Sequence, residues 1–331
     1  MKFALLGAGR IGRVHADAVA GNANANLVAV SDPIAEAANA ISATYGPKVR
    51  TIDEIEAAAE IDAVIICTPT DTHADLIERF SHAGKAVFCE KPIHLDIARV
   101  KTCLKVVQDT GTTLMVGFNR RFDPHFQALR LGIDEGKIGD VEMVQITSRD
   151  PGPPPLDYVK RSGGIFRDMT IHDFDMARFL LGEEPVTVSA QASVLVDDAI
   201  GKAGDFDSAN VILKTASGKH CAIGNSRRAT YGYDQRIEVL GSVGMISAEN
   251  QRPVSIEIAN ADGFTRPALH DFFMTRYTEA YAAEIAAFIE AVKNGTPATP
   301  SGDDGLKSLI LAEAALRSAT EGRTIAVSDV A

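Results

Sequence analysis

Short apolar runs alternate with helical stretches through the first third of the sequence, and this alternation constrains the fold more than any other feature. The apolar runs cover residues 3–6, 27–30, 63–67, 86–89 and 113–116, and the helical stretches between them include residues 35–44, 75–83 and 97–108. Strands that alternate with helices in this way predict βαβ units and a parallel sheet. Because the runs are continuously apolar, helices should cover both faces of that sheet.

The motif GAGRIG, residues 7–12, follows the first predicted strand and opens the first predicted helix. In this context Gly7 permits a tight turn, Gly9 lets a pyrophosphate approach the backbone, and Gly12 lets the helix pack closely on the strand. The helix N-terminus, which begins with Arg10 and Ile11, offers N–H groups and partial positive charge to phosphates. The motif therefore predicts a dinucleotide site, and a glycine-rich turn without a ligand is the alternative.

Asp32 ends the second apolar run, about 20 residues beyond the glycines, where an acid can accept hydrogen bonds from the adenosine ribose. A carboxylate there would repel a 2′-phosphate, and Pro33, Ile34 and Ala35 follow instead of an arginine. The cofactor is therefore predicted to be NAD rather than NADP. Asp32 can also cap the following helix, and the two roles are compatible.

The remaining two-thirds of the chain shows a different pattern of predicted elements, with successive strands joined by short turns. We predict a helix at residues 120–131, strands at 141–147, 186–196, 208–215, 220–226, 236–240, 245–248 and 254–258, and two closing helices at 277–293 and 304–321. Strands without intervening helices favour an open, mostly antiparallel sheet. The length of 331 residues also favours two domains, which we place at residues 1–119 and 120–331.

Composition excludes several classes of function. The formal net charge of −11, without any basic tract, argues against nucleic-acid binding. No apolar run approaches membrane-spanning length, so no membrane partner is expected. The four cysteines show no C-x-x-C spacing, and Cys67 and Cys89 lie in apolar runs, as expected for reduced, buried thiols in a cytoplasmic protein.

The stretch GGIFRDMTIHDFDMARFLLG, residues 163–182, predicts one long, largely buried helix that ends at Gly182. Asp168 and His172 are four residues apart and would share a helical face. A carboxylate beside an imidazole suggests an oriented general base, because histidine titrates near neutral pH. A purely structural His–Asp pair is the alternative. A metal site that includes Asp175 is not favoured, because no further His or Cys cluster lies nearby.

Lys91 follows the apolar run 86–89 directly and precedes Pro92. A charged residue at the carboxyl end of a parallel strand lies where doubly wound sheets bind their ligands. Lys91 is therefore a candidate for a site rather than a chance surface charge.

The ordered motifs GAGRIG, CTPTDTH, CEKP, GFNRRF and GGIFRDMTIHDFD resemble those of the glucose–fructose oxidoreductase/inositol dehydrogenase/MocA family, over essentially the whole chain. The stretches VGFNRRFD, SRDP and TYGYD are similar to the inositol dehydrogenase group within it. The resemblance implies an α/β protein: an N-terminal Rossmann domain with a doubly wound parallel sheet, and a C-terminal α+β domain with a large open sheet.

The resemblance also implies roles for particular residues. Lys91, Asp168 and His172 form the catalytic group. The residues implied at the cofactor are Thr68, His73 and Glu90, in addition to Gly7, Gly9, Arg10, Ile11, Gly12 and Asp32. The residues implied at substrate hydroxyls are Lys91, Arg120, Asp150, His172 and Tyr233. Asp150 departs from the asparagine of related inositol enzymes, and an aspartate accepts hydrogen bonds from hydroxyls but cannot donate.

The activity that this resemblance implies is NAD-dependent oxidation of a secondary hydroxyl of a cyclitol, with myo-inositol oxidised to 2-keto-myo-inositol. A dehydrogenase of glucose or xylose, or a non-catalytic NAD-binding sensor or scaffold, are the alternatives. No metal is expected. Val211, Ile212 and Leu213 are consecutive in a predicted strand of the open sheet, so both sheet faces carry apolar side chains. We therefore expect a homo-oligomer, specifically a tetramer built through that sheet.

Overall fold

The computed structural model describes residues 1–331, and the chain divides into two compact units. The first contains Met1–Asp123 and Thr278–Leu309, and the second contains Pro124–Tyr277 and Ile310–Ala331. The sequence had assigned everything after residue 119 to one second domain. In the structure, helix α12 (Thr278–Asn294) belongs to the first unit, where the Phe288 ring lies 6.2 Å from that of Phe3 and 5.8 Å from that of Phe88.

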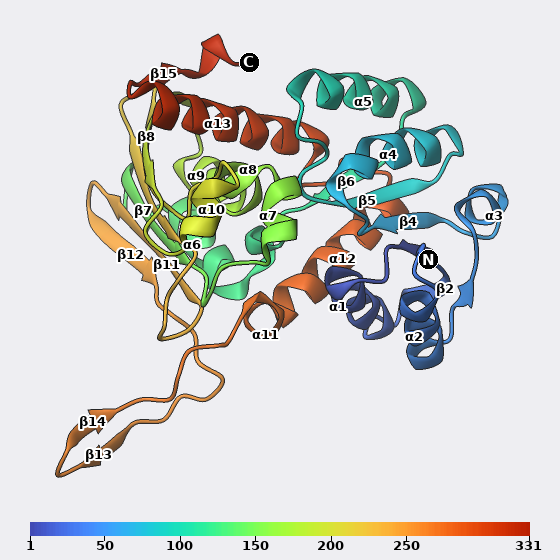
Figure 1. The fold of residues 1–331 in the computed structure, drawn as a ribbon, viewed down its shortest axis with the longest axis horizontal. Helices are drawn as coiled ribbons and strands as arrows, with labels where there is room; N and C mark the ends of the chain where they lie inside the picture. Colours follow the sequence, from blue (N-terminus) through green and yellow to red (C-terminus); the bar gives the residue numbers. More distant parts are fainter. The chain divides into compact units, whose positions relative to one another are not determined.

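A six-stranded parallel sheet forms the centre of the first unit (Figure 1). Its order is β3-β2-β1-β4-β5-β6, which is the strand order of dinucleotide-binding sheets. The strands are β1 (Lys2–Leu6), β2 (Asn26–Ser31), β3 (Lys48–Val49), β4 (Ala63–Ile66), β5 (Ala86–Glu90) and β6 (Leu114–Gly117). The predicted doubly wound parallel sheet is confirmed.

The helices that connect these strands are α1 (Arg10–Ala20), α2 (Ala35–Tyr45), α3 (Ile52–Ala57), α4 (His73–His82) and α5 (Ile97–Thr110), with the 3-10 turn η1 (Thr70–Thr72) before α4. A second 3-10 turn, η2 (Asn119–Phe122), follows β6. Every residue of β4 and β6 is buried, as are Phe3 to Leu6 of β1. Burial on both faces explains why these strands are continuously apolar in the sequence.

A seven-stranded mixed sheet forms the second unit, in the order β12-β11-β7-β10-β9-β8-β15. Its strands are β7 (Val141–Arg149), β8 (Pro185–Ser193), β9 (Ser208–Thr215), β10 (His220–Ser226), β11 (Asp234–Gly241), β12 (Gly244–Ala248) and β15 (Ile325–Ala326). The predicted, mostly antiparallel sheet is confirmed, although β10 and β7 pair in parallel. That pairing joins segments far apart in the sequence, so local turn patterns do not reveal it.

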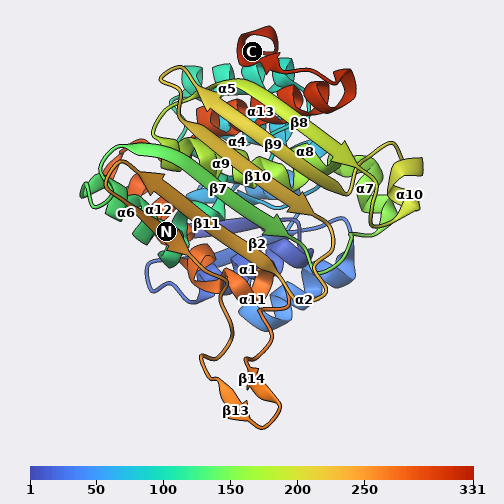
Figure 2. The same cartoon turned by 90° about the vertical axis from the view of Figure 1, so that its left-hand side faces the viewer.

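Helices cover one face of this sheet and leave the other open (Figure 2). The helices of this unit are α6 (Pro124–Asp134), α7 (Leu156–Ser162), α8 (Gly164–Asp168), α9 (Thr170–Leu181), α10 (Asp198–Lys202), α11 (Phe273–Arg276) and the part of α13 (Gly302–Glu321) that lies in this unit. The chain ends with the 3-10 turn η3 (Val327–Asp329). On the open face Leu240 is in register with both Met143 and Met245. All three side chains are exposed, which gives a continuous apolar surface across β7, β11 and β12.

Three predicted elements differ from the structure. The helix predicted at 120–131 is divided into η2 and α6, because Asp123 is extended before Pro124, as a residue before proline prefers. The helix predicted at 163–182 begins at Gly164, which like Gly163 has a positive φ, and is interrupted at Met169 between α8 and α9.

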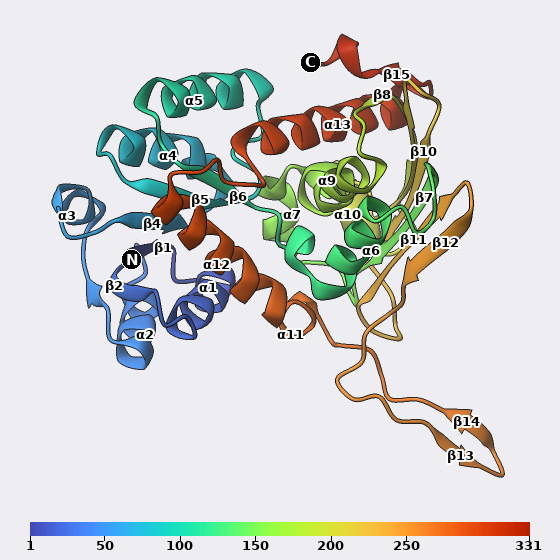
Figure 3. The ribbon, with the colours of Figure 1, turned by 180° about the vertical axis from the view of Figure 1, so that it is seen from behind.

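The strand predicted at 254–258 is also wrong. Only residue 258 of it is in a strand, β13 (Ile258–Asn260), whose single partner is β14 (Gly263–Thr265). These two short strands form the tip of a hairpin arm, residues 249–271, that projects from the second unit (Figure 3). The arm exposes Val254, Ile256 and Phe264. Separately, no helix is both long enough and apolar enough to span a bilayer.

Candidate active site

The three glycines of GAGRIG occupy the geometry that a dinucleotide needs. Gly7 has φ +93°, and a Cβ there would lie 2.5 Å from the carbonyl oxygen of Cys67. A Cβ on Gly12 would lie 2.0 Å from the oxygen of Gly7, so the helix can pack on the turn only without a side chain. A Cβ on Gly9, in contrast, would meet no atom within 4 Å. The backbone at Gly9 is therefore open to a ligand, as pyrophosphate approach requires.

The start of α1 supplies the complementary charge. No side chain caps the helix at Gly9, so its first N–H groups can bind phosphate oxygens. Arg10 is exposed in the first turn, and Ile11 is half-buried beside it. The residues present therefore fit a dinucleotide at this turn.

Asp32 ties the glycine turn to the end of β2. Its Oδ2 accepts a hydrogen bond from the N–H of Ala8 at 2.6 Å, and its Oδ1 accepts one from the N–H of Ile34 at 2.8 Å. Each carboxylate oxygen can accept more than one hydrogen bond, so Asp32 can still bind ribose hydroxyls. The expected capping role is not seen, because the N-cap of α2 is Ile34 and no side chain caps this helix. The expected ribose role remains compatible with the contacts of Asp32.

His73 connects the loops that follow β4 and β5. Its Nε2 lies 2.7 Å from the carbonyl oxygen of Thr68, and its Nδ1 lies 2.8 Å from that of Pro92. The ring is buried, and this burial lowers the pKa of His73. His73 therefore fixes the backbone on both sides of the sheet edge where Lys91, half-buried, follows β5.

Within the first unit, the structure brings the predicted cofactor residues to the carboxyl edge of the parallel sheet. The glycine turn, Asp32, Thr68 and Glu90 with Lys91 follow or end β1, β2, β4 and β5, which are neighbours in the sheet. Arg120 belongs to the same unit and is buried in η2, after β6. Ligands of doubly wound sheets bind at this edge.

In the second unit, polar contacts anchor the helix that carries His172. Asn225 of β10 accepts a hydrogen bond from the hydroxyl of Thr170 at 2.7 Å and donates one to Asp173 at 2.8 Å. These two residues flank His172, so α9 is fixed to the sheet on both sides of the imidazole. Sequence analysis missed Asn225, although an amide within the alternating strand 220–226 is a detectable signal.

Asp168 lies at the end of α8, before the interruption at Met169. It accepts hydrogen bonds from the Tyr158 hydroxyl at 2.7 Å and from Nη2 of Arg227 at 3.2 Å. The continuous helical face predicted for Asp168 and His172 is therefore wrong, because the two residues belong to different helices. Asp175 is buried, and its Oδ1 lies 3.7 Å from Nη1 of Arg178 in the same helix.

Arg227 is a buried cation that sequence analysis also missed. In addition to Asp168, it faces Asp150 and Asp205, each with a carboxylate oxygen 4.0 Å from the guanidinium. Burial raises the pKa of Asp205, and the charge of Arg227 acts in the opposite direction. Arg227 thus gathers two predicted site residues, Asp150 and Asp168, around one positive charge.

Tyr233 packs within an aromatic group of the second unit. Its ring lies 5.7 Å from that of Phe272 and 6.0 Å from that of Tyr277, in edge-to-face geometry. Its backbone N–H donates to the carbonyl of His270 at 3.0 Å. These contacts fix the ring of Tyr233.

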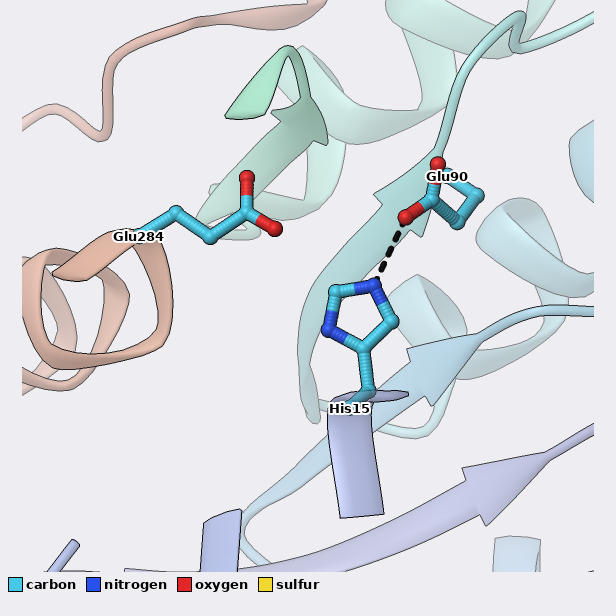
Figure 4. A group of neighbouring side chains, drawn as sticks. All are labelled: His15, Glu90 and Glu284. Carbon is cyan, nitrogen blue, oxygen red and sulfur yellow. Dashed lines mark hydrogen bonds and ion pairs between the residues drawn. The ribbon is translucent and has the colours of Figure 1, made fainter. Parts of the chain in front are cut away.

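One group of side chains has the composition of a metal site. It consists of His15, Glu90 and Glu284 in the first unit, with one donor atom of each within 4.8 Å of the others (Figure 4). Asp168, His172 and Asp175 do not form such a group.

Comparison with known proteins adds an independent line of evidence. Residues 1–118 match the model of an oxidoreductase family with an NAD-binding Rossmann fold, and residues 126–247 match that of the GFO/IDH/MocA C-terminal domain. The chain is 71% identical to an inositol 2-dehydrogenase of Rhizobium meliloti, over 99% of both chains.

Solved structures agree with this result. A myo-inositol dehydrogenase of Corynebacterium glutamicum is 43% identical, with a TM-score of 0.95 over 98% of both chains. A scyllo-inositol dehydrogenase of Lactobacillus casei, solved with NAD(H) and scyllo-inositol, is 29% identical, with a TM-score of 0.92 over 99% of both chains.

Proposed function

The chain belongs to the GFO/IDH/MocA family of NAD-binding oxidoreductases, and on that premise we propose that it is an inositol 2-dehydrogenase. It oxidises a secondary hydroxyl of a cyclitol, and with myo-inositol the product is 2-keto-myo-inositol (scyllo-inosose). The observation that carries this proposal is the identity to the Rhizobium enzyme along the whole of both chains.

The chemistry requires removal of one proton and one hydride from the carbinol. Bound NAD supplies the hydride acceptor. His172 takes the hydroxyl proton, a role that its anchored helix supports because a general base must be held within hydrogen-bond reach of that proton. Lys91 donates to the same oxygen and stabilises the negative charge that develops as the carbonyl forms.

Asp168 favours the protonated form of His172 and orients it, while Arg227 and Tyr158 fix Asp168 in turn. Arg120, Asp150 and Tyr233 contact the other ring hydroxyls. The Asp150 carboxylate lies 4.0 Å from the guanidinium of Arg227, and a carboxylate accepts hydrogen bonds from substrate hydroxyls.

A substrate panel tests this proposal. With NAD in excess, we expect myo-inositol to give a kcat/KM at least about tenfold above that of glucose or xylose, a difference of about 1.4 kcal/mol in transition-state binding. NADH absorbance measures each rate. A higher kcat/KM for either aldose would assign the chain to the sugar dehydrogenases, and no turnover of any polyol would favour a non-catalytic sensor.

Cofactor preference follows from the position of Asp32. We expect NAD to support turnover at least about tenfold better than NADP, because the carboxylate beside the ribose repels a 2′-phosphate. Asp32→Ala should narrow this difference. Asp32 also holds the N–H of Ala8, so a melting curve of the variant serves as the control for loss of the turn. Equal kcat/KM values for both cofactors in the wild-type protein would contradict the role given to Asp32.

We also propose that the protein assembles through the open face of its second sheet, as a homotetramer. Met143, Leu240 and Met245 are adjacent across three strands of this face and are 54%, 38% and 51% exposed. Ile212 on β9 is also exposed. A continuous apolar surface of this kind favours association, and a second copy presents the same surface to it.

Light scattering at micromolar concentration tests the assembly. We expect a mass of about four chains for the wild-type protein and a smaller one for Leu240→Glu, which places a charge at the centre of this surface. Leu195→Glu is the matched control, because Leu195 is an exposed leucine outside the sheet strands. A wild-type monomer would contradict the proposal.

We further infer a reducing, cytoplasmic environment from the four free and buried cysteines.

A further inference from the structure

Three ionisable side chains meet in the interior of the first unit (Figure 4). His15 comes from α1, Glu90 from the end of β5, and Glu284 from α12. His15 and Glu284 are fully buried, and Glu90 is 9% exposed. The Nε2 of His15 lies 2.6 Å from Oε1 of Glu90, and the carboxyl group of Glu284 points toward both.

The surroundings of Glu284 disfavour a negative charge. The His15 ring packs against the rings of Phe88 and Tyr281, at 5.0 and 5.6 Å, so the cluster lies among aromatic side chains. Neither carboxyl oxygen of Glu284 has a hydrogen-bond donor in the protein. An ionised carboxylate without donors is costly to bury. Burial raises the pKa of Glu284 well above its usual value, and the negative charge of Glu90 makes a second, smaller contribution in the same direction.

A metal ion is the other way to neutralise two buried carboxylates, but the geometry favours a proton. Ligands of one transition-metal ion, each about 2.0–2.2 Å from it, lie about 2.8 Å or more apart. His15 and Glu90 approach within 2.6 Å, which is a hydrogen-bond distance. That contact commits the Nε2 of His15 to Glu90 instead of to an ion.

The cluster includes the last residue of β5, Glu90, at the carboxyl edge of the parallel sheet. A Cβ on Gly117 would lie 3.2 Å from the carboxyl atoms of Glu90, so this carboxylate packs on the end of β6. Burial raises the pKa of the Cys67 thiol, and the nearby charge of Glu90 raises it further. Cys67 in turn supports Gly7 through the close approach of its carbonyl. Glu90 is therefore held at the sheet edge that binds NAD.

We propose that His15 is a positioning residue that holds the Glu90 carboxylate for NAD, and that Glu284 lies beside this pair as a neutral acid. The groups that face Glu284 are His15 from α1, Glu90 from β5 and Cys67 after β4, and α12 also packs on η2, which carries Arg120 and Arg121. This proposal rests on the proposed role of Glu90 at the cofactor and is independent of which polyol is oxidised.

Infrared spectroscopy of the whole protein tests the charge state of Glu284. At neutral pH we expect the carbonyl stretch of a protonated carboxylic acid in the wild-type spectrum and its loss in Glu284→Gln. Glu290→Gln is the matched control, because it removes an exposed carboxylate from the same helix and should leave the band unchanged. Absence of the band from the wild-type spectrum, or a stoichiometric metal ion by elemental analysis, would overturn the proposal.

The pH dependence of thermal unfolding gives a second test of whether Glu284 is protonated. A carboxyl group whose pKa is higher in the folded than in the unfolded protein stabilises the fold, and this stabilisation is complete at pH values below the unfolded-state pKa. The stabilisation is lost as the pH rises through the folded-state pKa. Because Glu284→Gln removes this loss, the melting temperature of the variant minus that of the wild type should increase from pH 5 to pH 9. A difference that stays constant would count against a neutral Glu284.

NADH binding, followed by fluorescence, tests the positioning role without any polyol. His15→Leu removes the hydrogen bond to Glu90 at similar volume, and we expect it to raise the Kd of NADH at least tenfold. His15→Gln and Glu284→Gln keep a polar group in place and should remain within threefold of the wild type. A folded His15→Leu protein with wild-type NADH affinity would overturn the proposal. A wrong polyol assignment would change none of these measurements.

Discussion

Replacing His172 with alanine is expected to lower kcat for polyol oxidation by about a hundredfold to ten-thousandfold, the usual range for loss of a general base. The Kd of NAD should barely change, because the residues proposed to bind it, the glycine turn and Asp32, are unaltered in this variant. The melting temperature should also change little, since Thr170 and Asp173 still anchor the helix through Asn225. Stopped-flow or steady-state NADH absorbance, together with a melting curve, measures all three quantities.

The companion variants define the role of His172 further. Lys91→Ala should also lower kcat, and the two losses should not add in the double variant, because both residues act on one developing charge. In the wild-type protein, oxidation should slow at acid pH as the imidazole becomes protonated. A folded His172→Ala protein with wild-type kcat would show that the His172 imidazole is structural.

Replacing Arg227 with methionine is expected to destabilise the protein by about 3–5 kcal/mol at neutral pH, the usual cost of removing one partner from a buried ionic group. Arg227 is only 2% exposed, and its loss leaves Asp150, Asp168 and Asp205 facing one another without a cation. Methionine keeps an apolar side chain of comparable length, so lost packing is a minor contribution. Turnover should also fall, because Asp168 loses the partner that fixes it.

The pH dependence identifies the cause of this destabilisation. Burial already raises the folded-state pKa of Asp205, and loss of the Arg227 charge raises it further. A group with a raised folded pKa stabilises the fold fully below its unfolded pKa, and this contribution is lost as the pH rises through the folded value. The deficit relative to the wild type should therefore grow between about pH 4 and pH 7. Urea denaturation measures it. Arg228→Met is the matched control, because the exposed guanidinium of Arg228 donates hydrogen bonds to the carbonyls of Leu195 and Val196. Its loss should cost no more than about 0.5 kcal/mol.

Local sequence patterns revealed the elements but not all of their boundaries. The strands at 208–215 and 220–226 were predicted residue for residue, because a short turn joins two alternating strands. The helix at 163–182 was predicted without its interruption, since no glycine or proline marks Met169. The segment 254–258 has the composition of a strand, yet it lies mostly outside one because it lacks a partner in the sheet.

The sequence alone determined the parallel sheet, the glycine turn and the identity of Asp32, Lys91 and His172 as candidates, because each depends on residues near one another in the chain. The tertiary structure alone decided which distant groups meet. Arg227 faces Asp168, Asn225 holds the helix of His172, and Glu284 reaches His15 and Glu90 across 194 or more positions of sequence. The reason is physical: buried charges and amides are stabilised by partners brought to them by packing, and one sequence carries no local record of such partners.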